Sequence, residues 1–575
     1  MILGYVVTAI VALAFAGLIA AIFLGRRELR KALSPYVNVY SVLALAALVA
    51  FFVIFSVLFV SPAEQLYFDE NIYQGIALNI LHNGNAAWCQ YGTAYLANGC
   101  PYSVIYHDPV GWSLFIAMAF AIFGVGTQTA YNLQLLVGAL SIIGVFLLSA
   151  VLFRRKDVPA LAAAFMALNP QLFIWSRTQA VADLPFMMLT VFAFFFFVVH
   201  VRRKSRITLA MAVFSVTLVV YTRIEAFMIV PILLLMYFLL GDKGIASNAR
   251  RRVAEFLKDT NNVRFLVLIA LLVILLLPQL FYIILQAKTG SYGQGNGSAL
   301  FSFSNFNSNF YPNLKFILGM LNYTYYYPVV FPLEITLAAV LGTVLFAVLG
   351  KARKDRFAVL LLLGLWVIAY YLFYDFFYAG SSLYGVDVRF MLQILAPLAI
   401  LAGLGVAELA ALVIWVLRMV FRNEMTSYLS YLFMGVLFVA LAAYPFVVLE
   451  PYFTIKPQQM PQQGKVLQAV DFIYGNYTKV PASCLVFSFT PDLWYTLGRS
   501  SAQIGYLGSS NATFVNFTRG YSCFVIDYGY WCQVPPYTNT TCTTMLHDYS
   551  LVPLAKTDNS TGTSLGLYRI LNYTT

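Results

Sequence analysis

The strongest constraint on this chain is the recurrence of long apolar runs, which begins at residue 2 and continues to residue 449. A helix needs about 20 consecutive apolar residues to cross a bilayer core. A transmembrane barrel would show alternating segments of about 10 residues, and these runs do not alternate. Only 10% of the residues are charged, against about 25% in soluble domains. We therefore expect an all-α polytopic membrane protein.

About twelve of these runs are long enough to be spans. A thirteenth, residues 111–125, is apolar but short, so we interpret it as an interfacial or re-entrant helix of the first external loop. The predicted spans are residues 2–24, 36–60, 128–152, 158–175, 184–201, 206–222, 226–240, 264–287, 329–350, 356–379, 390–418 and 427–449.

Charge sets the orientation of these spans. The formal net charge is +12, and the basic residues cluster in alternate loops, for example at residues 26–31, 154–156 and 202–204. Basic loops resist translocation and stay on the cytoplasmic side. This pattern accounts for the excess charge without nucleic-acid binding, which we do not expect. By alternation, residues 450–575 lie outside.

Cysteines and glycan acceptors agree with this orientation. We expect Cys89 and Cys100 to form a local disulfide, because both lie in the first external loop. The other cysteines, Cys484, Cys523, Cys532 and Cys542, allow three pairings, and their spacing lacks the CxxC of a zinc site. Asn-X-Ser/Thr acceptors also fall only in predicted external segments: Asn296, Asn322, Asn476, Asn511, Asn516, Asn539, Asn559 and Asn572.

These patterns divide the chain into three parts. Residues 1–35 form an extra N-terminal span with a basic cytoplasmic loop. Residues 36–449 form the membrane domain, whose first external loop covers residues 61–127. Residues 450–575 alternate short apolar runs (484–489, 523–528, 565–571) with turns around a helical pattern at 465–474, which predicts a small external α/β domain.

Acids near the membrane boundary are the candidate catalytic residues. Asp69 and Glu70 are adjacent in the first external loop, and Asp183 lies in a short external turn. Loop acids are commonly solvated, and Asp183 also reads as a helix cap with a surface ion pair. However, a carboxylate in apolar surroundings can act as a general base toward a hydroxyl.

Four external cations are candidates for binding a phosphate. Arg177, Arg223, Lys288 and Arg389 are each predicted near the membrane surface. Any one of them could be an anchor whose aliphatic stem lies along the lipid. Together they could hold a lipid phosphate, because the arginine fork matches phosphate oxygens.

In their order along the chain, these motifs resemble the GT-C superfamily of membrane glycosyltransferases. The most similar branch contains the dolichyl-phosphate-mannose protein mannosyltransferases and the lipid A aminoarabinose transferases. Asp69-Glu70 with residues 73–77 (Tyr-Gln-Gly-Ile-Ala) is similar to the acidic pair that opens the first external loop in that branch. The further matching motifs contain Tyr106-His107-Asp108-Pro109, Ser176-Arg177 with Asp183-Leu184-Pro185, and Asp387-Val388-Arg389-Phe390.

The resemblance implies an inverting transfer of a sugar, mannose among the candidates, from a polyprenyl (dolichyl) phosphate to an acceptor hydroxyl outside the membrane. Asp69 is then the general base, and Glu70 and Asp183 position the acceptor or the base. The donor phosphate is held by cations such as Arg389, Lys288 or Arg223. Arg177 and His107 are further phosphate candidates, and Tyr73, Tyr106 and Asp108 complete the loop site.

Two alternatives remain open. An oligosaccharyltransferase would carry a Trp-Trp-Asp motif in its tail, whereas residues 526–529 (Ile-Asp-Tyr-Gly) keep only part of it. A transporter would place ionisable groups at mid-membrane, and Glu408 is the clearest central candidate. We expect no cofactor and no resident metal. The expected partners are membrane lipids, the donor, and a glycan, lipid or protein acceptor, in an archaeal plasma membrane in preference to an endoplasmic reticulum.

Overall fold

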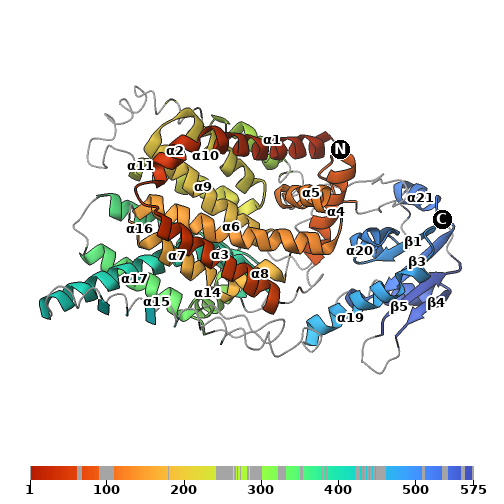
Figure 1. Cartoon of the computed structure of the whole chain (residues 1–575). Helices are drawn as coiled ribbons and strands as arrows, with labels where there is room; N and C mark the ends of the chain where they lie inside the picture. The colour runs from red at the N-terminus through yellow and green to blue at the C-terminus, as the bar shows by residue number, and fades with distance from the viewer. Residues whose placement is uncertain are drawn as a thin grey trace.

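The computed structural model contains a helical bundle with a small mixed sheet at one end (Figure 1). The described residues are those outside 63–67, 90–108, 241–262, 285–300, 321–331, 350–353, 383–385, 421–427, 448–460, 534–541 and 558–563. Scattered further positions, chiefly between 264 and 283 and between 430 and 446, also lie outside.

The N-terminal half of the bundle packs around α6 and α9, which lie side by side and are buried over most of their length. Its helices up to residue 240 are α1 (Ile2–Leu24), α2 (Arg26–Leu33), α3 (Val39–Phe59), α4 (Phe68–Asn83), α5 (Gly111–Phe123), α6 (Thr127–Phe153), α7 (Val158–Ala167), α8 (Pro170–Arg177), α9 (Asp183–Arg203), α10 (Arg206–Val220), η1 (Ile224–Met228) and α11 (Ile229–Leu240).

The second half of the bundle contains α14 (Phe303–Ile317), α15 (Leu333–Leu349), α16 (Lys354–Phe376), η3 (Val386–Met391) and α17 (Leu392–Val420). Helix α17 packs against α15, α16 and α7. Close approach is possible at the α15–α17 crossing because glycines face each other there. A Cβ added at Gly342 would lie 2.5 Å from the backbone nitrogen of Gly405.

Six helices in the described part of the chain are long and apolar enough to cross a membrane, so the chain is a multi-pass membrane protein. They are α1, α3, α6, α9, α16 and α17. The predicted count of twelve spans stays a prediction, because several predicted spans correspond to shorter helices or lie partly outside the described residues.

One predicted span differs from a single straight helix. Residues 158–175 form α7 and α8, which are bent by 56° relative to each other. The break lies at Asn169-Pro170. Asn169 caps α8 by accepting a hydrogen bond from the Gln171 backbone, and Pro170 lacks the N–H that a continuous helix would need.

The C-terminal region carries a five-stranded sheet with strand order β2-β1-β3-β5-β4. Strand β1 lies between β2 and β3 and pairs in parallel with both, while β5 runs antiparallel to both β3 and β4. The strands are β1 (Cys484–Ser488), β2 (Ser500–Gln503), β3 (Cys523–Tyr528), β4 (Leu551–Lys556) and β5 (Gly566–Ile570).

Helices precede the first strand and lie between successive strands from β1 to β4. They are α19 (Pro461–Asn476), η5 (Tyr477–Lys479), α20 (Pro491–Thr496), η6 (Ile504–Tyr506), α21 (Ala512–Thr518), η7 (Tyr530–Gln533) and α22 (Thr543–Asp548). The helix predicted at 465–474 and the strands predicted at 484–489, 523–528 and 565–571 are therefore present. The α/β character of this region is confirmed.

Candidate functional site

The predicted base sits in an ion pair at the start of a helix. Asp69 belongs to the first turn of α4, where the sequence had suggested a loop. Its Oδ2 lies 2.7 Å from Nη1 of Arg389, which is in η3 just before α17. The Asp69 side chain is 31% exposed, whereas that of Arg389 is 12% exposed. Asp69 is thus the accessible member of the pair.

Asp183 joins this pair to a second arginine. It is the first residue of α9 and is 1% exposed. Its Oδ1 lies 3.0 Å from Nη1 of Arg223, and its Oδ2 lies 3.9 Å from Nε of Arg389. The alternative reading of Asp183 as part of a surface ion pair is therefore wrong, since this pairing is buried and does not involve the neighbouring Arg177. We call Asp69, Arg389, Asp183, Arg223 and Glu225 the charge cluster.

Glu225 and Tyr374 complete the buried side of the charge cluster. Glu225, in η1, is ion-paired with Nε of Arg223, and the Tyr374 hydroxyl from α16 donates to the same carboxylate. Phe390 lies against both arginines, with their Cζ atoms 5.3 Å (Arg223) and 5.0 Å (Arg389) from its ring centre. These are cation–π distances.

Sequence reasoning did not select Glu225 or Tyr374, and it named Phe390 only as part of the motif that contains Arg389. An acid two positions after Arg223 could have pointed to Glu225. The contacts of Tyr374 depend on the packing of α16, which a single sequence does not show.

The charge cluster carries one more carboxylate than guanidinium groups, which bears on whether it can bind a further anion. Three carboxylates face two guanidinium groups, all at least two-thirds buried. Ionised groups removed from water are costly unless they are paired and hydrogen-bonded. Each guanidinium has five donors, so one arginine can serve a carboxylate and a further anion together.

Glu70 points away from this cluster. It is fully buried, and its Oε2 accepts a 2.7 Å hydrogen bond from the Tyr131 hydroxyl on α6. The first turn of α4 is thus tied to α17 through Asp69 and to α6 through Glu70. The two adjacent acids have different surroundings.

The start of α5, within the predicted first external loop, positions Arg223 and Asp183. Gly111 donates from its backbone to the Tyr221 carbonyl at 2.6 Å, and a Cβ there would lie 2.6 Å from that oxygen. Trp112 Nε1 donates to the Ala180 carbonyl at 2.9 Å. These bonds hold the backbone two residues before Arg223 and three before Asp183.

The remaining predicted residues are placed as follows. Tyr73 is buried on α4, one turn after Asp69. Arg177 donates to Asn132 at 3.4 Å and takes no part in the ion pairs of the described residues. Four predicted site residues lie outside the described residues: Tyr106, His107, Asp108 and Lys288.

The C-terminal cysteines form two disulfides, Cys484–Cys523 and Cys532–Cys542. Cys484 and Cys523 are also paired in register on β1 and β3. The Cys89–Cys100 bridge stays a prediction, because Cys100 lies outside the described residues.

Among the predicted glycan acceptors, Asn516 and Asn572 are exposed and Asn476 is half-buried. Five others lie outside the described residues: Asn296, Asn322, Asn511, Asn539 and Asn559.

An apolar groove is lined in part by η1 and α16, which also carry Glu225 and Tyr374. It contains about 900 Å³ of empty space, including its open side. Met228, the last residue of η1, and Phe373, the neighbour of Tyr374, both line it. The full lining is Met228, Phe301, Ser302, Phe303, Ala369, Leu372, Phe373 and Phe376.

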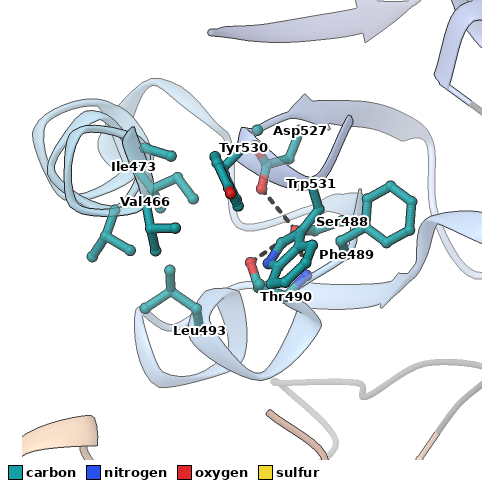
Figure 2. A pocket seen from close by; sticks show the side chains of 12 residues that line it. Val466, Ile473, Ser488, Phe489, Thr490, Leu493, Asp527, Tyr530 and Trp531 are labelled. Carbon is teal, nitrogen blue, oxygen red and sulfur yellow. Dashed lines mark hydrogen bonds between the residues drawn. The ribbon is translucent and has the colours of Figure 1, made fainter. Parts of the chain in front are cut away.

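A second, smaller cavity lies in the C-terminal region, between α19 and the ends of β1 and β3 (Figure 2). Asp527 accepts hydrogen bonds there from Ser488 at 2.7 Å and from Trp494 at 2.9 Å. Burial raises the pKa of the Asp527 carboxyl. These bonds tie α20 to two strands, so the cavity contains a structural crosslink.

A metal site is not evident in the described part of the chain, where no three His, Cys, Asp or Glu side chains gather as ligands. The absence of a metal requirement remains an expectation.

Comparison with known proteins agrees with the resemblance drawn from the motifs. The model of the family described as dolichyl-phosphate-mannose-protein mannosyltransferase matches residues 107–282, which include Asp183 and Arg223. A search of curated protein sequences gives no significant match.

Solved structures extend the comparison to the fold. ArnT from Cupriavidus metallidurans bound to undecaprenyl phosphate is similar at a TM-score of 0.54 and 13% identity, over 93% of this chain and 98% of that chain. Its apo form gives 0.51 and 14%, over 92% and 97%. AglB, an oligosaccharyltransferase from Archaeoglobus fulgidus in complex with an inhibitory peptide and a dolichol-phosphate, gives 0.48 and 15%, over 92% and 74%.

The chain is therefore a multi-pass membrane protein with a GT-C fold, as the motifs predicted. Within that class, residues 107–282 resemble the dolichyl-phosphate-mannose-protein mannosyltransferases.

Proposed function

We propose that this protein is an inverting glycosyltransferase that moves a sugar from a polyprenyl phosphate to an acceptor hydroxyl on the outer face of the membrane. The observation that carries the proposal is the Asp69–Arg389 ion pair. It places a candidate base beside a candidate phosphate ligand, at the accessible end of an otherwise buried charge cluster.

The donor phosphate would bind at Arg389, with Arg223 behind it. Arg389 uses Nη1 for Asp69, while its Nε lies 3.9 Å from Asp183. A guanidinium carries five N–H donors, so one arginine can contact a carboxylate and a phosphate oxygen together. The predicted cations Lys288 and His107 would add the positive charge that the cluster lacks.

The polyprenyl chain would lie in the apolar groove. Met228 is three residues after Glu225 in η1, and Phe373 precedes Tyr374 in α16. The groove and the charge cluster therefore share two elements. A lipid with an anionic head and a long apolar tail is complementary to a charged site and an apolar groove that share these elements. ArnT was crystallised with such a lipid, undecaprenyl phosphate.

Asp69 would act as the general base. Among the described residues, its carboxylate is contacted by Arg389 at Oδ2, so Oδ1 can accept a proton. The acceptor oxygen forms a bond to C1 of the sugar and transfers its proton to Asp69. The C1–O bond to the lipid phosphate breaks, and the electron pair leaves with the phosphate. One displacement of this kind inverts the configuration at C1.

One contact weighs against the alternative that the protein is a transporter. Glu408 was the predicted mid-membrane acid, but it is ion-paired with Arg155 at the connection between α6 and α7. Arg155 belongs to a basic cluster predicted to face the cytoplasm. With that topology Glu408 would lie toward a membrane surface, and its charge is balanced by Arg155.

The test is transfer by the purified full-length protein. Labelled polyprenyl-phosphate sugars, mannosyl first, are incubated with glycan, lipid and peptide acceptors carrying hydroxyl groups, and products are read by mass spectrometry. We expect a product whose anomeric configuration is opposite to that of the donor. Retention of configuration would exclude single displacement, and absence of transfer from every polyprenyl-phosphate donor would contradict the proposed function.

A further inference from the structure

The C-terminal region contacts the helix that carries the proposed base. Helix α20 packs against α4, and Figure 1 shows α20 beside α4 at that end of the bundle. This interface includes two close side-chain contacts. The Tyr495 hydroxyl and His82 Nε2 are 2.8 Å apart, and the Asp492 carboxyl lies directly over Gly75.

The contact at Gly75 leaves no space for a side chain. A Cβ added at Gly75 would lie 2.6 Å and 2.7 Å from the two carboxyl oxygens of Asp492. Asp492 is 3% exposed, so it cannot simply turn out to solvent. Gly75 is six residues after Asp69, which is about 9 Å along the helix. A displacement at Gly75 would therefore move Asp69.

The other side of α20 is held firmly. Trp494 donates to Asp527 Oδ2 on β3, and Ser501 on β2 donates to the Pro491 carbonyl. The sheet thus fixes α20, and α20 presses on α4. At the start of α4, Glu70 and Asp69 are bonded to Tyr131 and Arg389. The helix is held at its catalytic end by the bundle and further along by the C-terminal region.

We propose that Gly75 and Asp492 are positioning residues, through which the C-terminal region fixes α4 and thereby sets the direction of the Asp69 carboxylate. The inference rests on the proposed function only for the role of Asp69. It assigns the small residue at position 75 a physical reason, which is the close approach of α20.

The test is a size swap across the contact. Gly75→Ala should push α4 and α20 apart. Misplacement of about 1 Å can cost up to roughly 100-fold in rate, so we expect kcat to fall about 10- to 100-fold. The donor KM should stay near its normal value, because Arg223 and Arg389 are not on α4. Asp492→Ala removes both oxygens, and the double variant should recover most of kcat.

The matched control is Gly364→Ala in α16, where an added Cβ meets nothing within 4 Å. It makes the same substitution inside a helix and should leave kcat unchanged. Normal kcat in folded Gly75→Ala, or a double variant no faster than Gly75→Ala, would overturn the proposal. Should Gly75→Ala fail to express, Tyr495→Phe, which loses the contact with His82, replaces it, and the same loss of kcat is expected.

A second readout separates this inference from the proposed function. In Asp69→Cys, the rate of labelling by a maleimide reports the setting of the first turn of α4 without requiring transfer. We expect Gly75→Ala to change that rate several-fold and Asp492→Ala to restore it. Equal labelling rates in all backgrounds would overturn the positioning role. If the wild-type protein transfers no sugar, the proposed function fails, but the labelling still decides the inference.

Discussion

Arg389 donates a 2.7 Å hydrogen bond to Asp69 across 320 residues of sequence, and this bond joins the start of α17 to the start of α4. It brings together two residues that have separate roles in the proposed reaction. One is the base that activates the acceptor, and the other is a ligand of the donor phosphate. In that proposed reaction the same arginine would orient the base and bind the leaving group.

Arg389→Lys should impair transfer although it keeps the positive charge. Lysine cannot contact Asp69 and a phosphate with the fixed fork of a guanidinium. A hydrogen bond to a charged group contributes about 1.5–3 kcal/mol, so we expect kcat/KM to fall roughly 10- to 150-fold. The measurement is steady-state transfer at varied donor concentration, with exposed Arg519→Lys as control. Wild-type kinetics in Arg389→Ala would remove the residue from the site.

Tyr374→Phe tests the buried side of the charge cluster. The substitution removes the hydroxyl that donates to Glu225 and leaves that carboxylate with one fewer partner. An unsatisfied buried acceptor costs about 1–3 kcal/mol. We expect a lower unfolding temperature than in exposed Tyr311→Phe. A Tyr374→Phe variant as stable as wild type would mean that Glu225 does not depend on this bond.

The disulfides of the C-terminal region should be found as Cys484–Cys523 and Cys532–Cys542. Non-reducing peptide mapping identifies them directly and also tests the predicted Cys89–Cys100 bridge. In the chain-entropy account, loops of 39 and 10 residues contribute about 4 and about 3 kcal/mol. Reduction should therefore destabilise the C-terminal region, and any other pairing would contradict the structure.

Asp492 should make the stability of the C-terminal region fall as pH rises. Burial raises the pKa of this carboxyl well above its ordinary value of 3.8. Above pH 3.8 the unfolded chain has released a proton that the folded chain still holds, so stability decreases with pH up to the folded pKa. Each unit by which the pKa in the folded chain exceeds the pKa in the unfolded chain lowers the free energy of unfolding by up to about 1.4 kcal/mol.

Asp492→Asn removes this proton, so its stability advantage over wild type should be larger at pH 7 than at pH 4. Burial lowers the pKa of the nearby His82, which makes stability rise with pH, but that contribution is common to both proteins and cancels in the comparison. Thermal unfolding at the two pH values provides the measurement, with exposed Asp548→Asn as control. An equal difference between the proteins at both pH values would contradict a buried neutral carboxyl.

The sequence predicted those parts of the structure that depend on local pattern. Apolar runs predicted the spans, and strands rich in β-branched and aromatic residues, such as β1 and β3, were found. Strand β2 has the sequence Ser-Ser-Ala-Gln and is a strand because it pairs with β1. Its sequence carries no such signal.

The site was partly predictable for the same reason. Asp69, Asp183, Arg223 and Arg389 all fall at helix starts or turns on one predicted side of the membrane, so alternation alone placed them at one level. Their pairing was not predictable. It depends on how α4, α9 and α17 pack, and Glu225 entered the cluster only through contacts with Arg223 and Tyr374.

Asp69→Asn is the decisive variant for the mechanism. Asparagine keeps the size of the side chain and can still accept a hydrogen bond from Arg389, but it cannot take the proton of the acceptor hydroxyl. General-base catalysis contributes about 10²- to 10⁴-fold, so transfer should fall by that factor while donor binding persists. Glu70→Gln should reduce kcat less, because Glu70 accepts a hydrogen bond from Tyr131 and faces away from the charge cluster.

The exposed acid Asp471 on α19 provides the control, and the Asp471→Asn variant should transfer sugar at the normal rate. Transfer and donor binding are measured on the same preparations, after size-exclusion chromatography has established that each variant is folded. Near-normal transfer by folded Asp69→Asn would exclude Asp69 as the base and leave the GT-C fold with a different catalytic group.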